Sequence, residues 1–383
     1  MAITINQQPA AFTPSDNPIV WTFSSNQTAQ PNFVYVVKVY INDTLISNEL
    51  VFPDNGIYGR YDASNHASNY CNLPTIGSAI VADAANYCKV RITIVERYGA
   101  TPADAASVVG TNKIAWKSKM FDSDFINWNP TPYTYGSDAL WLTNYPDYPS
   151  VRLEDESVRL MLINNLNNIT LTIYLYDANG DEVNNDVIVS GVGSAFYISI
   201  LELSPANIIS LTGLTTADFE DSAYYEVSIP TSVAAQRINI DRSVVYPTYK
   251  RLHAVTQWGG IEAVSFGLIS RKKGKIASKS YIRGLGNWNG SAFEFTEAQG
   301  RDIDYAKTIE REMVCVSDWL SESLQNWLIY NIIASPAVFI EETTGLVRRA
   351  VKSRTVEEFI KDNDMIFLEE VTVTLPTYNS MIL

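Results

Sequence analysis

The chain has 383 residues, a formal net charge of -14 and only 18% charged residues. An acidic surface repels the phosphate backbone of nucleic acids, so the composition argues against a nucleic-acid-binding protein. The N-terminus lacks a basic start and an apolar core, and no run of about 18 apolar residues occurs, so neither a signal peptide nor a membrane span is expected.

The first 14 residues are polar and contain Pro9 and Pro14. This composition predicts an N-terminal arm, residues 1–14, that becomes ordered only against another surface.

Residues 15–120 carry short segments typical of strands, separated by turn residues. Residues 33–41 are rich in Val, Tyr and Ile, and residues 90–95 alternate between apolar and polar side chains. Regularly spaced short strands of this kind predict an immunoglobulin-like β-sandwich domain.

Residues 121–248 are predicted to form a second β domain. In residues 169–176 the aliphatic side chains fall on one face of a strand, and the turn sequence Asp-Ala-Asn-Gly-Asp follows at 177–181. The Trp-, Tyr- and Pro-rich residues 121–149 are too apolar for a free linker, and we expect them to pack across the junction between two domains.

Residues 249–383 are predicted to form a C-terminal β domain with one amphipathic helix at about 318–334, capped by Ser317 or Asp318. A tight turn is expected at Trp258-Gly-Gly, and a second turn at residues 271–275 leads into a strand at 278–283. The predicted fold is therefore mainly β, with two to three β-sandwich or barrel-like domains.

No pattern of catalytic residues is recognisable. The two histidines, His66 and His253, lie in no protease or nucleophile-elbow motif. The Gly pairs at 56/59 and 284/286 match no phosphate-binding loop, and adjacent glutamates at 341–342 and 369–370 would point to opposite faces of a strand. We therefore expect no catalytic residues, no cofactor and no enzyme activity.

Residues 177–181 resemble the opening of a calcium-binding loop. The EF-hand pattern requires Glu at its twelfth position, where this chain has Ile188. A hairpin turn is the favoured interpretation, and a loose calcium site with oxygen ligands remains the alternative, so no metal is predicted.

The three cysteines are Cys71, Cys88 and Cys315. Their spacing matches no zinc site, and their small odd number suits a reducing compartment. One disulfide between Cys71 and Cys88 remains possible on this evidence.

A basic cluster stands out in so acidic a chain: Arg271, Lys272, Lys273, Lys275, Lys279 and Arg283. Its first four residues, Arg271, Lys272, Lys273 and Lys275, are the candidate interface. One interpretation is a solvated hairpin tip. A second is a plug for an acidic surface on another copy of the chain, because complementary charges fix register and partner choice. DNA contact is a third, lesser interpretation.

Several segments form an ordered set along the chain: residues 17–26, 32–41, 55–62, 125–128, 141–146, 225–227, 252–266, 318–320 and 335–338. In this order they resemble a family of virion structural proteins, from the tail or neck ring of tailed phages that infect Bacteroidetes-type hosts, including crAss-like phages. The resemblance implies a structural role and no catalytic residues.

The resemblance also implies partners and a location. The expected partners are copies of the same chain in a ring and neighbouring tail, portal or fibre proteins of the virion, after assembly in the host cytoplasm. No membrane partner is expected, and nucleic acid would only pass through the lumen of the ring. The alternative is a carbohydrate-binding receptor-recognition or fibre-attachment protein of the tail, which the 22 Tyr and 8 Trp residues suggest.

Overall fold

The computed structural model of the protein describes residues 3–73, 86–135, 140–145, 149–153, 156, 158–164, 168–191, 198–229, 235–242, 250–268, 271–282, 286–294, 302–335, 337–341, 347–350 and 367–382. The chain divides into two compact units, Met1–Ser243 with Ala254–Ala263, and Val244–His253 with Val264–Leu383. Strands account for 52% of the chain and helices for 14%, which confirms the predicted mainly β fold of the β-sandwich type.

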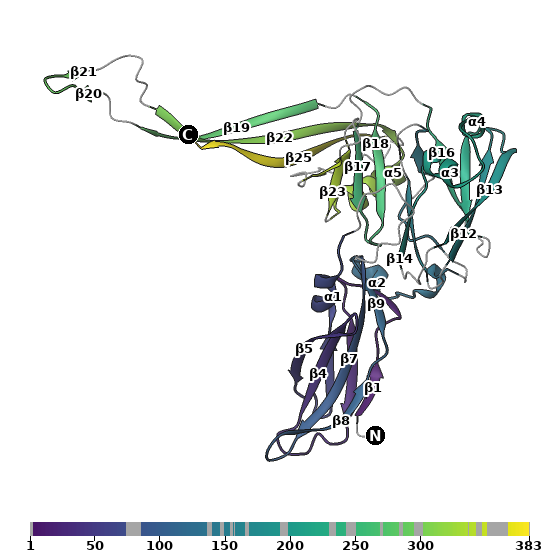
Figure 1. Ribbon diagram of the computed structural model, residues 1–383, viewed down its shortest axis with the longest axis vertical. Coiled ribbons are helices and arrows are strands. Elements are labelled where there is room, and N and C mark those ends of the chain that lie inside the picture. The colour runs from purple at the N-terminus through teal and green to yellow at the C-terminus, as the bar shows by residue number, and fades with distance from the viewer. Residues whose placement is uncertain are drawn as a thin grey trace. The chain divides into compact units, whose positions relative to one another are not determined.

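The first part of unit 1, purple to blue in Figure 1, contains two sheets. One has the strand order β1-β3-β6, and the other has the order β2-β9-β7-β4-β5, with β8 also paired to β7. The elements are β1 (Ile3–Gln7), β2 (Phe12–Pro14), β3 (Val20–Ser25), β4 (Val34–Ile41), β5 (Thr44–Val51), β6 (Tyr58–Asp62), α1 (Ser64–Tyr70), β7 (Tyr87–Tyr98), β8 (Ala103–Val109) and β9 (Lys113–Trp116).

Alternating side chains build the core of this sandwich. In β3, Trp21 and Phe23 are fully buried, while Val20 and Thr22 on the other face are half-buried. The same alternation continues in β7, where Val90, Ile92 and Ile94 join the same core. Burial of such side chains stabilises the fold by roughly 1.5–3 kcal/mol each.

The predicted N-terminal arm is instead part of this sandwich. Ile3–Gln7 pairs antiparallel with β3, and Phe12–Pro14 pairs in parallel with β9. Pro14 is tolerated because β2 is an edge strand, where one row of N–H groups is not needed for pairing. The polar residues of β1 are exposed while Ile3 is buried, so the polarity of the segment reflects an edge position.

The second β domain of unit 1 combines a five-stranded sheet of order β10-β16-β15-β12-β13 with the pair β11-β14. The predicted aliphatic face of β12 is buried in its core, which confirms that expectation. The elements are β10 (Ser150–Val151), β11 (Arg159–Ile163), β12 (Asn168–Tyr176), β13 (Glu182–Gly191), β14 (Ile198–Glu202), α3 (Pro205–Leu211), α4 (Thr216–Asp221), β15 (Tyr224–Ser228) and β16 (Ala235–Ile240).

Aromatic residues fill the junction between these two β domains, as the sequence predicted. The short helices α2 (Asp122–Phe125) and η1 (Thr131–Tyr133) lie in this stretch. The Trp128 ring lies 5.9 Å from that of Trp116 and stacks on Tyr133 at 5.4 Å. One apolar cluster includes these rings with Met161 and residues from both domains, so the two domains share a packed boundary.

Unit 2 contains most of a four-stranded sheet of order β18-β17-β23-β24 and a three-stranded sheet of order β19-β22-β25. The tip of the β17–β18 hairpin, Ala254–Ala263, belongs to unit 1. The elements are β17 (Lys250–Val255), β18 (Ile261–Phe266), β19 (Arg271–Ile282), β20 (Asn287–Trp288), β21 (Phe293–Glu294), β22 (Asp302–Leu320), α5 (Glu322–Trp327), η2 (Leu328–Ile333), β23 (Val338–Glu341), β24 (Val347–Ala350) and β25 (Phe367–Ile382).

The predicted C-terminal helix is present but begins later than expected. Its first proposed turn belongs to β22, because Leu320 pairs with Phe367 of β25. Ser321 is the N-cap, and its hydroxyl accepts a hydrogen bond from the backbone N–H of Leu324. The helix continues as a π-helical turn to Ile333, and Trp327 is among its buried residues.

Candidate assembly surface

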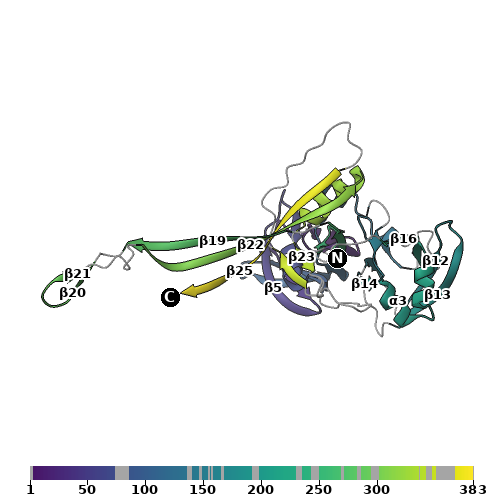
Figure 2. The ribbon, with the colours of Figure 1, turned by 90° about the horizontal axis from the view of Figure 1, so that it is seen from above.

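The predicted basic cluster lies on β19, an edge strand of the ribbon that β19, β22 and β25 form. Figures 1 and 2 both show these three strands side by side as one long ribbon. The turn expected at residues 271–275 is wrong, because β19 is continuous from Arg271 to Ile282 and Gly274 lies in register opposite Arg311. The 19 residues of β22 span about 60 Å at roughly 3.3 Å per residue.

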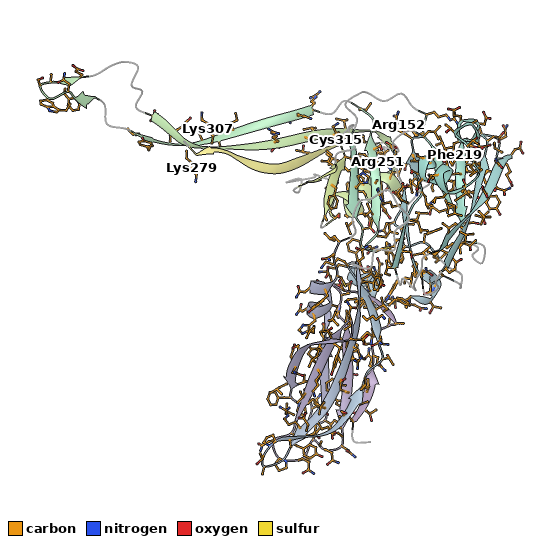
Figure 3. All side chains as sticks on the ribbon, viewed as in Figure 1. Arg152, Phe219, Arg251, Lys279, Lys307 and Cys315 are labelled. Carbon is orange, nitrogen blue, oxygen red and sulfur yellow. The ribbon has the colours of Figure 1, made fainter. Side chains whose placement is uncertain are left out.

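Alternation along β19 sorts the basic residues between its two faces. Arg271, Lys273 and Lys279 occupy alternate positions and so share one face, whereas Lys272 is on the other. The side chains of Arg271, Lys272, Lys273 and Lys279 are exposed. Figure 3 labels Lys279 together with Lys307 of β22 on the ribbon. The structure thus brings Arg271, Lys273 and Lys279 of the predicted cluster onto one strand face, while Arg283 lies outside the described residues.

Part of this positive charge faces acidic positions of the same chain. The register places Lys273 opposite Glu312 and Lys275 opposite Glu310. Opposite charges at directly paired strand positions stabilise a sheet by roughly 0.2–1 kcal/mol per pair. Lys273 therefore lies at a strand position paired with an acidic residue of the same chain.

The other face of β19 carries apolar side chains at alternate positions, Ile276 and Ile282. The Ile276 side chain is 66% exposed, and Ile282 near the end of the strand is 71% exposed. Every described side chain of β19 is exposed, so nothing in the described chain covers this strand on either face.

An edge strand also presents one row of backbone N–H and C=O groups to its surroundings. A strand from another chain can hydrogen-bond to such a row. Among the strands that the structure describes, the β19 edge therefore combines three properties of a pairing surface: an open row of backbone groups, apolar side chains and a set of positive charges.

The two histidines each contact a glutamate. His66 Nε2 lies 2.8 Å from Glu49 Oε1, and the Tyr61 hydroxyl donates to the same oxygen at 2.8 Å. In unit 2, the fully buried His253 lies 2.6 Å from Glu341. Each histidine thus has a specific carboxylate partner within its own unit.

Acid is expected to weaken the Glu49 cluster. Burial alone would raise the pKa of Glu49, but hydrogen bonds from His66, Tyr61 and Ser47 lower it overall. A carboxyl group with a lowered folded pKa stabilises the fold above its unfolded pKa of about 4.3, and this contribution is lost as the pH falls through the folded value. In urea unfolding from pH 6 to pH 3, the stability difference between wild type and Glu49→Gln should therefore shrink. A difference that stays constant over this range would contradict the assignment.

Residues 177–181 form the predicted hairpin turn between β12 and β13. The Asp177 carboxylate accepts hydrogen bonds from the backbone N–H groups of Asn179 at 2.8 Å and Asp181 at 2.9 Å. These bonds, led by the one from Asp181, lower the pKa of Asp177. Gly180 has a φ of +88°, a conformation that favours glycine. The carboxylate therefore serves the turn itself.

Within the described residues, no group of three or more His, Cys, Asp or Glu side chains is arranged to hold a metal ion. No helix in the same part of the chain is long and apolar enough to cross a membrane. Neither a protein-family model nor a curated protein matches this chain.

Proposed function

We propose that the chain is a structural component of a tailed-phage virion that forms an oligomeric ring in the tail or in the head-to-tail neck region. The observation that carries this proposal is the exposed β19 strand of the ribbon, with Ile276 and Ile282 largely exposed. Isolated β ribbons are marginally stable in water unless a face is covered. In a self-assembling protein, a second copy of the chain would cover the exposed face of the ribbon.

The remaining features agree with assembly as the main task. Mainly β units with open edges suit side-by-side contacts between copies, and heterologous contacts close into rings when the rotation between copies permits. The ordered resemblance to virion ring proteins supplies the phage context. Neighbouring tail, portal or fibre proteins would contact the completed ring, whose lumen would allow nucleic acid to pass.

A ring predicts a defined oligomer. The purified chain should form one closed species of fixed copy number, measured by light scattering after size-exclusion chromatography and seen as rings in electron micrographs. A chain that stays monomeric at high concentration, and that is absent from phage particles analysed by mass spectrometry, would contradict the proposal.

The basic face of β19 should contribute to this assembly. Reversing one exposed charge with Lys279→Glu is expected to weaken self-association by roughly tenfold, because like charges at an interface oppose binding. The exposed Lys119 on unit 1 supplies the control, since Lys119→Glu makes the same change of charge elsewhere. Sedimentation velocity at low and high salt measures both variants. If both variants weaken self-association equally, the net charge of the chain explains the effect and the basic face of β19 has no specific role.

The second candidate function, carbohydrate binding, has one feature in its favour. Tyr174, Tyr176 and Tyr224 form a half-buried row on one face of the five-stranded sheet, with stacked rings 6.4 Å and 5.0 Å apart. The Arg237 guanidinium lies 3.5 Å from the Tyr224 ring centroid. Glycan-array binding that is lost in Tyr174→Ala would favour this function, although these rings already stack on one another.

A further inference from the structure

The ribbon of unit 2 has two open edges, β19 on one side and β25 on the other. The central strand β22 pairs antiparallel with both, so β19 and β25 run in the same direction. Figures 1 and 2 show the two outer strands along the ribbon. Among the strands that the structure describes, neither outer strand has a partner on its far side, so each presents a row of backbone N–H and C=O groups.

Strand length limits which edge can pair with the whole of β19. That strand has 12 residues, and β25, with 16, is the one other edge strand in the described part of the chain that is at least as long. The next longest edge strand is β13, with 10 residues. On β13, the backbone N–H of Asn185 donates to the side chain of Asn184 at 2.9 Å. The N–H of Val187 donates to the Asp186 carboxylate at 2.7 Å, so the β13 edge is already partly satisfied by its own side chains.

The charge of β19 opposes pairing between two copies of the same strand. Its sequence Arg-Lys-Lys-Gly-Lys-Ile-Ala-Ser-Lys-Ser-Tyr-Ile contains five basic residues and no acidic one. Antiparallel pairing about a two-fold axis would place these like charges opposite one another, which destabilises a sheet. The sequence of β25 contains Glu369 and Glu370 and no basic residue. Charge complementarity therefore favours β25 over a second β19 as the partner.

We propose that β19 of one copy pairs in parallel with β25 of the next copy, so that the ribbons of all copies form one continuous sheet around the ring. Rotation about an axis along the strands keeps their direction, and β19 and β25 already run the same way, so the new pair is parallel. The contact is heterologous, and it closes when the last copy meets the first. Closure leaves no edge of the ribbon open to uncontrolled pairing. This inference rests on the proposed ring and names the strands that join its copies.

Pairing of this kind also gives the exposed side chains of β19 new neighbours. Ile276 and Ile282 are largely exposed, and side chains on adjacent strands of a sheet lie side by side. The sequence of β25 is rich in apolar and β-branched residues, which are the residue types that pack well at such positions. Main-chain hydrogen bonds along β19 would supply affinity, and these side-chain contacts would supply specificity.

Variants of the full chain with one added cysteine test the proposal. Ser278→Cys adds a thiol to β19, and Thr374→Cys or Asn379→Cys adds one to either half of β25. Co-expression of the β19 variant with a β25 variant, followed by a short bismaleimide that links two thiols, should give a covalent dimer on a denaturing gel. Each variant alone should stay at the mass of one chain, because each junction between copies then holds a single added thiol. The three native cysteines are buried, and the wild-type chain controls for their reaction.

The matched control is Asn185→Cys, which adds an exposed thiol to β13, the next longest edge strand. Covalent dimers from the β19 and β25 variants together, and from no other combination, support the inference. A dimer from Ser278→Cys alone would mean that two β19 strands pair about a two-fold axis. A dimer from Ser278→Cys with Asn185→Cys would identify β13 as the partner. Either of these results overturns the inference.

Light scattering on the wild-type chain separates failure of the inference from failure of the proposed function. If wild type forms a closed oligomer and no mixture gives a covalent dimer, the pairing of β19 with β25 is wrong while the proposed ring stands. If wild type is monomeric, the proposed function fails first, and the inference fails with it.

Discussion

Replacing Gly259 with alanine is expected to lower the free energy of unfolding of unit 1 by about 2–5 kcal/mol. Gly259 has a φ of +81°, and a Cβ atom there would lie 2.5 Å from the carbonyl oxygen of Lys117 and 3.0 Å from the Trp116 ring. The left-handed conformation alone costs an L-residue about 1–2 kcal/mol. The clash adds to this cost because it meets backbone, which is unable to rotate away.

The position matters because the turn at Gly259 is anchored within unit 1. The Trp116 Nε1 donates to the Trp258 carbonyl at 2.7 Å, and the Gly259 N–H donates to the Thr256 carbonyl at 2.9 Å. A shift of the turn would therefore break the hydrogen bond of a buried tryptophan and disturb the aromatic junction. Urea unfolding followed by intrinsic tryptophan fluorescence measures the loss of stability, because the affected tryptophans lie beside the turn.

Gly56 provides the matched control. Its φ of +80° is nearly the same, but a Cβ atom there would meet nothing within 4 Å. Gly56→Ala should therefore cost only about 1–2 kcal/mol, the conformational part of the penalty. Equal losses of unfolding free energy in the two variants would show that the clash with the Lys117 carbonyl does not destabilise the Gly259→Ala variant.

Strands in the cores of the β domains were predictable because their pattern is local. Residues 33–41 include β4, which is rich in Val, Tyr and Ile, and residues 169–176 fall within β12, where alternate side chains are buried. The turn at Trp258-Gly-Gly was also recognisable, because glycine at positive φ marks a tight turn. In each case a few consecutive residues are enough to predict the strand or the turn.

The ends of elements in unit 2 depend on distant partners and were harder to predict. Leu320 fits the spacing of the helix that follows, but its pairing with Phe367 places it in β22. Gly274 and the basic residues around it are typical of a turn, yet pairing with β22 keeps the segment extended. Long-range pairing overrides local propensity at such positions.

The candidate site was predictable only in part. The basic cluster was visible as an excess of charge, and its role as an interface stays a prediction. The hairpin of β20 and β21 was missed, although the sequence Trp-Asn-Gly-Ser-Ala-Phe at 288–293 carries the Asn-Gly turn signal between two aromatic residues.

Mild oxidation is expected to join Cys71 and Cys88 and to raise the free energy of unfolding of the first sandwich by about 3 kcal/mol. The two sulfur atoms lie 3.3 Å apart, the two residues are 17 positions apart in sequence, and both thiols are free and buried. Closing such a loop restricts the unfolded chain more than the folded one. The experiment tests whether the Cys71–Cys88 disulfide, which the sequence allows, can form.

The reaction should be slow and specific. The hydrogen bond to Cys88 and burial raise the pKa of the Cys71 thiol well above its usual range, so little of the reactive thiolate is present at neutral pH. Diamide supplies the oxidant: the two thiols lose two electrons and two protons, the S–S bond forms, and diamide is reduced to its hydrazine. The thiol count of the denatured protein should fall from three to one, because the Cys315 thiol remains. Cys88→Ala should show neither this loss nor the gain in stability. A wild-type chain that keeps all its thiols after prolonged oxidation would mean that the two side chains do not reach each other in solution.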